Sequence, residues 1–359
     1  MDSQQRAGAL NLLTNCAALK AGETVLLVRE DPAYGYFDAA APDAVEQTAR
    51  EIGAEVFSLT TRRIDGPEQV PALLKAAMET VDHTIFFNRI GDQMRFKPLP
   101  GPGSKTICYA LDGETLGHAF CTTHHGLYTE LLRRFQEEID ETTRWRITCP
   151  MGTELEGESD PPPPAKRGQG DFTLNLFPVT TFRPIPCDRM SGQVVLKRWV
   201  NGTNTHRYEP EVLRFEGAVT VFIEQGRIRD LDGPPEAVEA LRRHGRMVGE
   251  KFGQDPGLVH SWHGGINPKT AYPGKAVDDP VRWAGVVFAS PRYLHFHTAA
   301  DYAPGEISWH IIDPTVTFDG QVYWQNGRFS YLERPEVKAL TDDFKGSNGA
   351  FKPIDEIGL

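Results

Sequence analysis

Histidines concentrate in one stretch near the C-terminus of this 359-residue chain. The chain has eleven histidines, and the stretch holds five of them: His260, His263, His295, His297 and His310. Three acidic residues accompany them: Asp301, Glu306 and Asp313. Neutral imidazole is the commonest ligand of borderline divalent metals, and carboxylates add the negative charge that holds a cation. This mixture therefore predicts a site for Zn, Fe or Mn rather than for Ca or Mg.

The other histidines give a weaker signal. A lone histidine is more often a hydrogen-bonded structural residue than a ligand, so we interpret His83, His118, His206 and His244 as structural. The pair His124–His125 precedes an expected helix, where it could cap that helix or border an active site.

The pattern of expected strands and helices changes along the chain. A chain of this length is expected to form two domains. Over 1–145, strands alternate with helices, which predicts a doubly wound, Rossmann-like α/β sheet. The expected helices are 7–20, 42–54, 67–80 and 127–140, and the expected strands are 24–28, 54–60, 83–89 and 105–111. No glycine-rich nucleotide motif follows the first strand, so no nucleotide is predicted there.

Residues 146–359 are expected to form an α+β, strand-rich domain that carries the metal site. Short apolar segments punctuated by Gly, Asp and Pro indicate its strands. They are 173–182, 192–200, 216–228, 283–290, 292–297, 307–312 and 315–324. One helix, over 234–252, interrupts them and opens with proline, which is tolerated at the first helical turn.

Composition excludes several classes of partner. A formal charge of −11 without a basic block argues against nucleic acid or an anionic membrane surface. No basic-then-apolar leader and no apolar run of roughly 18 residues is present. The five cysteines are scattered and form no CxxC pair, so neither a disulfide framework nor a thiolate zinc site is indicated. We expect a cytoplasmic protein that acts on a small molecule.

Three segments resemble a known superfamily. They are GAVTVFIEQGRIRDLDG at 217–233, HSWHGGINP at 260–268 and WHIIDPTVTFDGQVY at 309–323. They are similar to the M29 (thermophilic leucyl) aminopeptidase-like superfamily, and most similar to its ring-cleaving branch, the 2,5-dihydroxypyridine 5,6-dioxygenases. Enzymes of that branch carry a segment of the HxGWGxNP type and a later HxD, which together form a two-histidine, one-aspartate iron site.

The two branches differ in the number of metals. The peptidases hold two metals with extra glutamates, whereas this sequence has His260 and Thr181 at the two glutamate positions. A two-metal hydrolase needs that negative charge. The resemblance therefore implies one metal, Fe(II), with Zn, Mn or Co as alternatives, in a ring-cleaving extradiol-type dioxygenase that uses O2 and a hydroxylated pyridine or related aromatic compound. It also implies a homodimer or higher homo-oligomer.

The resemblance also implies roles for individual residues. The expected metal ligands are His260, His310 and Asp313, and the expected acid/base groups are His297, His295 and His263. Apart from the resemblance, side-chain type and position near these motifs make four residues the expected substrate contacts: Trp262, Thr181, Arg183 and Tyr302. Arg183 or Arg292 could pair with a substrate carboxylate.

Several alternatives stay open. The glycine-rich segment is one residue longer than the motif, so His263 could replace His260 as the ligand. The HxD motif is HIID here, which on a regular strand turns His310 and Asp313 to opposite faces unless Pro314 marks a distortion. A three-histidine site that includes His295 is the alternative. Two other functions also stay open: a metal-dependent aminopeptidase or amidohydrolase, and a non-catalytic metal-binding protein.

Overall fold

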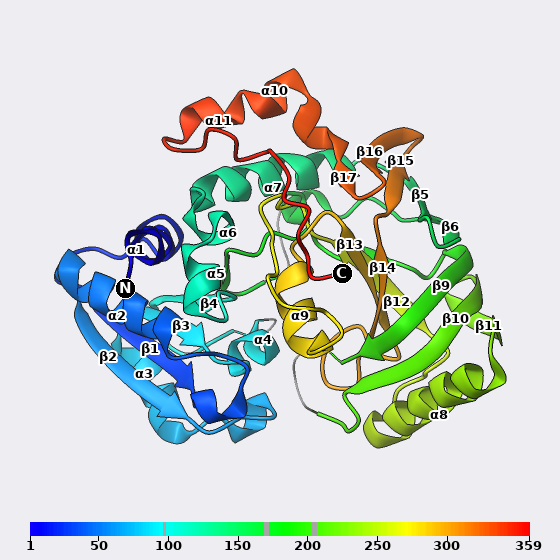
Figure 1. Cartoon of the computed structure of the whole chain (residues 1–359), viewed down its shortest axis with the longest axis horizontal. Coiled ribbons are helices and arrows are strands. Elements are labelled where there is room, and N and C mark those ends of the chain that lie inside the picture. Colours follow the sequence, from blue (N-terminus) through cyan, green and yellow to red (C-terminus); the bar gives the residue numbers. More distant parts are fainter. Residues whose placement is uncertain (96–97, 169–171, 203–206) are drawn as a thin grey trace.

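The structure is a computed structural model that describes residues 1–95, 98–168, 172–202 and 207–359. Two sheets dominate it: a five-stranded parallel sheet and a large, curled antiparallel sheet. In Figure 1 the parallel sheet and its helices lie on the left, the antiparallel sheet lies on the right, and helix α9 stands between them. His206, interpreted above as structural, falls outside the described residues.

The parallel sheet has the strand order β2-β1-β3-β4-β7. Its strands are β1 (Thr24–Glu30), β2 (Glu55–Thr61), β3 (His83–Phe87), β4 (Ser104–Cys108) and β7 (Asn175–Phe177). The helices of this region are α1 (Ser3–Leu10), α2 (Ala40–Ile52), α3 (Ala72–Thr80), α4 (Ile90–Met94), α5 (Gly113–Gly117), α6 (Ala119–Thr122) and α7 (His125–Ile139). A π-helical turn, Asn11–Cys16, continues α1. The apolar run at the first strand is buried between helices, as expected for a parallel sheet.

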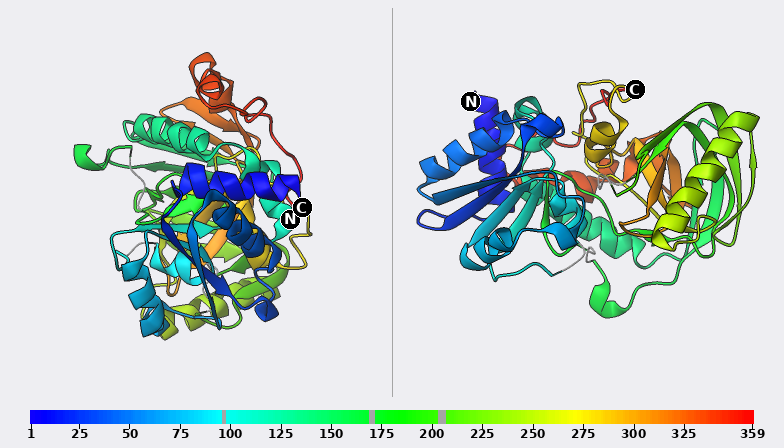
Figure 2. Two further views of the ribbon diagram at one scale, coloured as in Figure 1. Left: turned by 90° about the vertical axis from the view of Figure 1, so that its left-hand side faces the viewer. Right: turned by 90° about the horizontal axis from the view of Figure 1, so that it is seen from below.

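The antiparallel sheet follows the order β17-β16-β15-β5-β6-β9-β14-β13-β12-β8, and β10 and β11 extend it from β9. Its first strands are β5 (Arg144–Thr148), β6 (Glu154–Glu158), β8 (Ile185–Pro186), β9 (Ser191–Asn201), β10 (Val212–Glu224) and β11 (Arg227–Asp232). The later ones are β12 (Val259–Gly264), β13 (Tyr293–Thr298), β14 (Ile307–Ile312), β15 (Thr315–Phe318), β16 (Gln321–Gln325) and β17 (Arg328–Phe329). Helix α8 (Pro235–Phe252) lies beside β9, β10 and β11, as Figure 2 shows, and α10 (Pro335–Lys338) and α11 (Leu340–Asp343) follow the last strand.

Three adjacent strands, β12, β13 and β14, position the histidines. In the register of this pairing, His263 lies opposite His295, and His295 lies opposite His310. Ser261 lies opposite His297. Because alternate residues of a strand share a face, these side chains belong to one face of the sheet.

The structure corrects the type of one predicted element. Residues 283–290 were expected to form a strand, but Pro280–Val287 is helix α9. A short apolar run cannot be assigned from periodicity when every side of it is buried. The capping Asp279 and Pro280 at the first helical position were the local signals for a helix.

The predicted boundary at residue 145 does not divide the two sheets cleanly. Residue 145 lies inside β5, and β7 returns from beyond it to complete the parallel sheet. The core on the parallel side also takes in Trp199, Trp283 and Tyr293 from the second part of the chain. The α/β and strand-rich halves are thus confirmed in outline. Among the described residues, no helix has both the length and the apolar character that a membrane crossing requires.

Candidate metal centre

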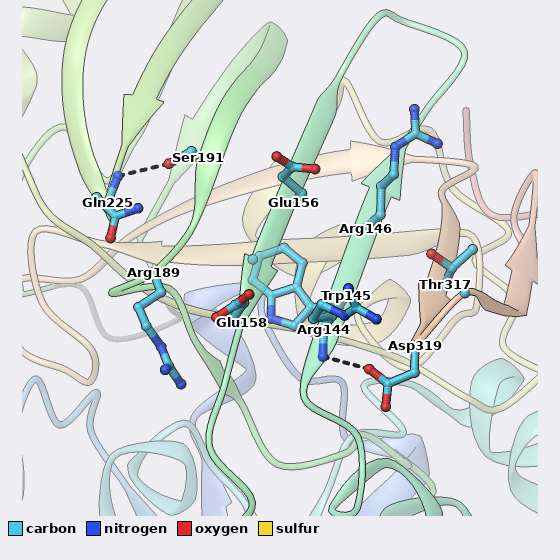
Figure 3. Close-up of a pocket in the computed structure, with 12 residues that line it drawn as sticks. Arg144, Trp145, Arg146, Glu156, Glu158, Arg189, Ser191, Gln225, Thr317 and Asp319 are labelled. Carbon is cyan, nitrogen blue, oxygen red and sulfur yellow. Dashed lines mark hydrogen bonds between the residues drawn. The ribbon is translucent and has the colours of Figure 1, made fainter.

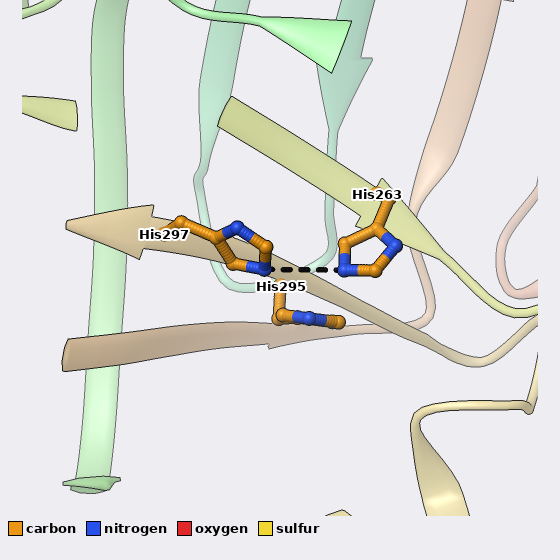
Figure 4. A group of neighbouring side chains, drawn as sticks. All are labelled: His263, His295 and His297. Atoms are coloured by element: carbon orange, nitrogen blue, oxygen red, sulfur yellow. Dashed lines mark hydrogen bonds between the residues drawn. The ribbon is translucent and has the colours of Figure 1, made fainter. Parts of the chain in front are cut away.

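Three buried histidines converge on one face of the antiparallel sheet. His263 comes from β12, and His295 and His297 come from β13. Each offers a ring nitrogen, and these three atoms lie within 4.8 Å of one another. The side chains point toward a common centre in Figure 4. We call them the histidine cluster; it is the one group of potential metal ligands found in the part of the chain that the structure describes.

The orientation of His263 is fixed from outside the cluster. Its Nδ1 lies 2.9 Å from the hydroxyl of Thr181 and 3.2 Å from the carbonyl of Phe182. The Thr181 hydroxyl itself donates to the carbonyl of Gly264, so it accepts a hydrogen bond from Nδ1. His263 therefore carries its proton on Nδ1 and turns the lone pair of Nε2 toward the cluster.

Hydrogen bonds from outside the cluster orient His297 in a similar way. Its Nδ1 lies 3.1 Å from Ser261 Oγ, and the Ser261 hydroxyl donates to the carboxylate of Asp301 at 2.5 Å. Asp301 Oδ1 also lies 3.6 Å from Nδ1. On the other side of the ring, the buried Glu306 carboxylate lies 3.6 Å from Nε2. Nδ1 thus donates outward, and Nε2 of His297 points inward like Nε2 of His263.

The two inward nitrogens lie 3.1 Å apart. If both Nδ1 atoms carry the ring protons, two lone pairs face each other, and a positive centre must lie between them. A proton can fill this place, and so can a metal ion: bonds of roughly 2.1 Å to nitrogen put two neighbouring imidazole ligands about 3 Å apart. Nδ1 of His295 is buried without a hydrogen-bond partner among the described residues. The cluster therefore fits a metal ion.

The electrostatics of the cluster favour ligand-competent histidines. Burial lowers the pKa of His263 well below its usual value, and the neighbouring His297 and Arg95 lower it further. Burial likewise lowers the pKa of His295, assisted by His263 and His297. For His297, burial acts in the same direction, but Glu306 and Asp301 outweigh it and raise the pKa above the ordinary value. The shifts therefore favour the neutral forms of His263 and His295 and the protonated form of His297.

His310 lies in an aromatic environment instead. Its ring stacks on Tyr293 at 5.6 Å between centroids and meets Trp199 and Trp283 at 5.5 Å and 5.3 Å. Its Nδ1 has no hydrogen-bond partner among the described residues. Burial lowers the pKa of His310 to about 4. Among the described residues, no contact of His310 orients a lone pair toward the histidine cluster.

The predicted triad of His260, His310 and Asp313 is not brought together. Asp313 lies just past β14 with a positive φ of 52°, so the expected distortion before Pro314 exists. The Asp313 carboxylate, however, accepts hydrogen bonds from Nε and Nη2 of Arg292, at 2.6 Å and 2.9 Å, and does not point to the cluster. His260 directs Nε2 to the carbonyl of Ala299 at 3.1 Å. His263 takes part in the cluster in place of His260, which was the alternative left open by the longer glycine-rich segment.

The residues expected to contact substrate are dispersed. Trp262 is fully buried on the other face of β12, where it stacks on Phe318. Arg183 forms an ion pair with Asp140. Tyr302 and Arg183 do share a cavity of about 380 Å³ with His260. Thr181 orients His263, as described above, and is a neighbour of the cluster rather than part of the 380 Å³ cavity.

A hollow of about 760 Å³ lies away from the histidines (Figure 3). It covers the outer face of β5 and β6 and contains charges of both signs, including Arg144, Glu156 and Asp319. The Asp319 carboxylate accepts hydrogen bonds from the backbone N–H groups of Thr143 and Arg144. Size alone therefore does not mark the functional site here.

Sequence reasoning missed two contributors to the site. Ser261 is one residue from the predicted His260, and the strand register that places it opposite His297 would have identified it. Arg95 belongs to the parallel-sheet half, and its charge lowers the pKa of His263 and His295. No local motif marks Arg95, because its role depends on how the two halves of the chain pack.

Comparisons with known proteins agree with this fold. The dihydroxypyridine dioxygenase of Pseudomonas putida KT2440 has a similar structure, with a TM-score of 0.57 and 13% identity over 90% of this chain and 95% of that one. AmpT from Thermus thermophilus matches with a TM-score of 0.51 and 13% identity, over 91% and 98%. This chain shares their fold. The resemblance stated from the sequence is therefore confirmed for the fold. No family model and no curated protein sequence matches the chain.

Proposed function

We propose that this protein is a mononuclear, Fe(II)-dependent dioxygenase that acts on a hydroxylated pyridine or related aromatic compound. The observation that carries the proposal is the histidine cluster, in which two ring nitrogens face each other at 3.1 Å and a third lies within 4.8 Å. His263, His295 and His297 would hold the ion. Three neutral imidazoles suit a first-row transition metal and leave coordination positions open.

The ligand charges favour one metal over two. A pair of divalent ions held close together needs bridging carboxylates to offset their repulsion. In the described residues, the cluster consists of imidazoles, with Glu306 on one side of His297 and Asp301 on the other. Both carboxylates contact His297, and neither joins the three mutually close ligand atoms. One ion is therefore the better fit, which weighs against the two-metal peptidase reading.

Bound iron would supply the ability to pass electrons between an electron-rich ring and O2. The protein side of the chemistry is orientation and proton transfer. Thr181 and the pair Ser261–Asp301 hold two of the three imidazoles in the tautomer that a metal requires. Glu306 is buried beside Nε2 of His297 and is our candidate for the base that accepts the hydroxyl proton of the substrate.

Oxygen uptake tests the proposal. Protein reconstituted anaerobically with Fe(II) is mixed with air-saturated dihydroxypyridines, catechols and hydroquinones, with His263→Ala as the inactive variant and His260→Ala as the matched control. The proposal predicts uptake that needs Fe(II) and His263 and that survives in the His260 variant. No uptake from any of these compounds, together with amine release from aminoacyl amides by Zn- or Co-loaded protein, would identify a hydrolase instead.

A further inference from the structure

A cavity of about 300 Å³ lies between helix α8 and the antiparallel sheet. We call it the helix cavity. Residues of α8 form one wall, and residues of β9, β10, β11 and β14 form the others, in the part of the molecule where Figure 1 places α8. The buried part of its lining is apolar and includes Leu196, Val200, Val221, Ile307 and Trp309. Protein interiors are otherwise close-packed, and a hollow of this size matches the lower end of the range for small-molecule sites.

The helix cavity lies behind the sheet, away from the histidine cluster. Ile307 and Trp309 of β14 line it. Ser308 and His310 alternate with them along the same strand, and His310 lies opposite His295 of the cluster. Because successive side chains of a strand point to opposite faces, the sheet separates the two places. A ligand in the helix cavity is therefore independent of the proposed metal site.

His244 is a polar residue on the otherwise apolar buried face of α8. It follows the helical spacing of Ala237, Leu241 and Val248, which are also buried. His244 lines the helix cavity, is 4% exposed, and has no hydrogen-bond partner for Nε2 among the described residues. The ring of Tyr208 packs against it edge-on at 5.7 Å between centroids. Burial lowers the pKa of His244 to about 4, so its imidazole is neutral.

A hydroxyl group is the natural partner for this nitrogen. A buried polar atom without a hydrogen bond is unfavourable, so a ligand that supplies the missing partner is favoured. Nε2 of a neutral imidazole either donates or accepts, depending on the tautomer, and an O–H group can do both. A ligand hydroxyl therefore pairs with His244 in either tautomer.

The charges at the rim of the helix cavity are paired with one another. Three arginines line this rim, and their side chains are about half exposed. Each forms an ion pair at 2.9 Å to 3.2 Å, and the pairs are Arg229–Glu224, Arg242–Asp230 and Arg246–Glu239. A charged ligand would thus enter an apolar space without a free counter-ion, which is costly. The helix cavity is suited to a neutral molecule.

We propose that the helix cavity binds a small, neutral, mainly apolar alcohol, with its hydroxyl group on Nε2 of His244 and its hydrocarbon part against the apolar lining. A cavity of ~150 Å³ can hold benzene, so twice that volume has room for roughly a dozen non-hydrogen atoms. This site goes beyond the proposed dioxygenase activity and does not depend on it.

The first test compares two probes that differ in charge. Cyclohexylmethanol and cyclohexanecarboxylate share one ring and fit a cavity of this size. Each would be titrated into metal-free protein, where no metal can hold the hydroxyl group, and followed by the NMR signals of the ligand. The alcohol is expected to bind more than about tenfold more tightly, because the carboxylate would be buried without a partner. Equal binding of the two, or no binding of the alcohol, would overturn the inference, and this comparison needs no variant.

The second test observes His244 itself. In protein with ¹⁵N-labelled histidine, cyclohexylmethanol is expected to shift the Nε2 resonance of His244, because that nitrogen gains a hydrogen bond. Methylcyclohexane, which lacks the hydroxyl group, fills the same space and should leave the tautomer and hydrogen bonding of His244 unchanged. The His244→Phe variant assigns the resonance. A shift of the cluster histidines in place of His244 would contradict the proposed location.

Two variants locate the binding. Leu231→Trp adds bulk to the lining from the edge strand β11 and is expected to abolish binding of cyclohexylmethanol, whereas Val322→Trp, the matched control on exposed β16, keeps the wild-type affinity. His244→Phe keeps a ring of similar shape and should weaken the alcohol more than about fivefold without weakening methylcyclohexane. Full affinity for the alcohol in both folded cavity variants would overturn the inference.

A last control separates this site from the proposed metal centre. His263→Ala should bind cyclohexylmethanol as the wild type does. If binding is lost in His263→Ala and kept in Leu231→Trp, the alcohol occupies the histidine cluster and the helix cavity is not its site. If the alcohol binds as expected but no aromatic compound provokes oxygen uptake, the dioxygenase proposal fails and the alcohol site stands.

Discussion

His263 and His310 lie on one face of the same sheet, two strands apart, in opposite chemical settings. Nδ1 of His263 donates hydrogen bonds to the Thr181 hydroxyl and the Phe182 carbonyl, so the lone pair of Nε2 faces the cluster. His310 packs against three aromatic rings, and its Nδ1 has no partner in the described part of the chain. If His263 binds a metal as proposed, the residue type alone does not make a ligand. A polar partner behind the imidazole selects the tautomer and the direction of the lone pair.

The largest effect is expected from removing a ligand. His263→Ala, His295→Ala and His297→Ala should each lower the affinity for Co(II), used as a stable substitute for Fe(II), by more than about 100-fold, because loss of a direct ligand exceeds the loss of a supporting group. Equilibrium dialysis with metal analysis measures this. His260→Ala is the matched control and should bind within about threefold of the wild type; a large loss in this variant would restore the ligand set predicted from the sequence.

A smaller effect is expected from the support behind His297. Ser261→Ala and Asp301→Asn leave the imidazole in place but remove the group that orients it. Such changes cost about 10-fold to 100-fold in metal affinity. The same dialysis measurement applies, with Asp313→Asn as the control, because that carboxylate is bonded to Arg292. If Asp313→Asn weakens binding and Asp301→Asn does not, the comparison between the two settings is wrong.

Metal affinity should also depend on pH through His297. The metal-free protein holds a proton there with a raised pKa, so an entering metal must displace it below that pKa. Below the pKa of His297, metal affinity is expected to fall about tenfold for each unit by which the pH is lowered. Above that pKa, metal affinity no longer depends on this proton. Glu306→Gln removes an interaction that raises the pKa and should shift the break to lower pH. An unchanged break in this variant would contradict the assigned cause.

The smallest effect is expected at His310. Phenylalanine keeps the aromatic packing and removes a buried nitrogen without a partner, which is close to neutral or stabilising. His310→Phe should change the free energy of unfolding by less than about 1.5 kcal/mol, by thermal or denaturant unfolding, and metal affinity by less than about threefold. A severe loss of metal would show that His310 does approach the ion.

The sequence predicted most of the fold and part of the site. Local sequence pattern was enough to predict the alternating strands and helices and the histidine-rich stretch. Helix α8 begins at the proline that predicted its start. Helix α9 was misread as a strand because its buried apolar run has no distinctive period. The choice of His263 over His260 depends on strand register, and the position of Asp313 depends on a positive φ and on Arg292. Arg95 joins the site only through the packing of distant segments, which one sequence does not encode in any local motif.

The most direct test of the central claim is anomalous X-ray scattering from crystals of the Fe(II)-reconstituted protein, recorded on both sides of the iron absorption edge. We predict one iron peak, within bonding distance of the ring nitrogens of His263, His295 and His297. A peak beside His260, His310 or Asp313, two peaks close together, or protein that takes up no iron would contradict a single metal ion in the histidine cluster.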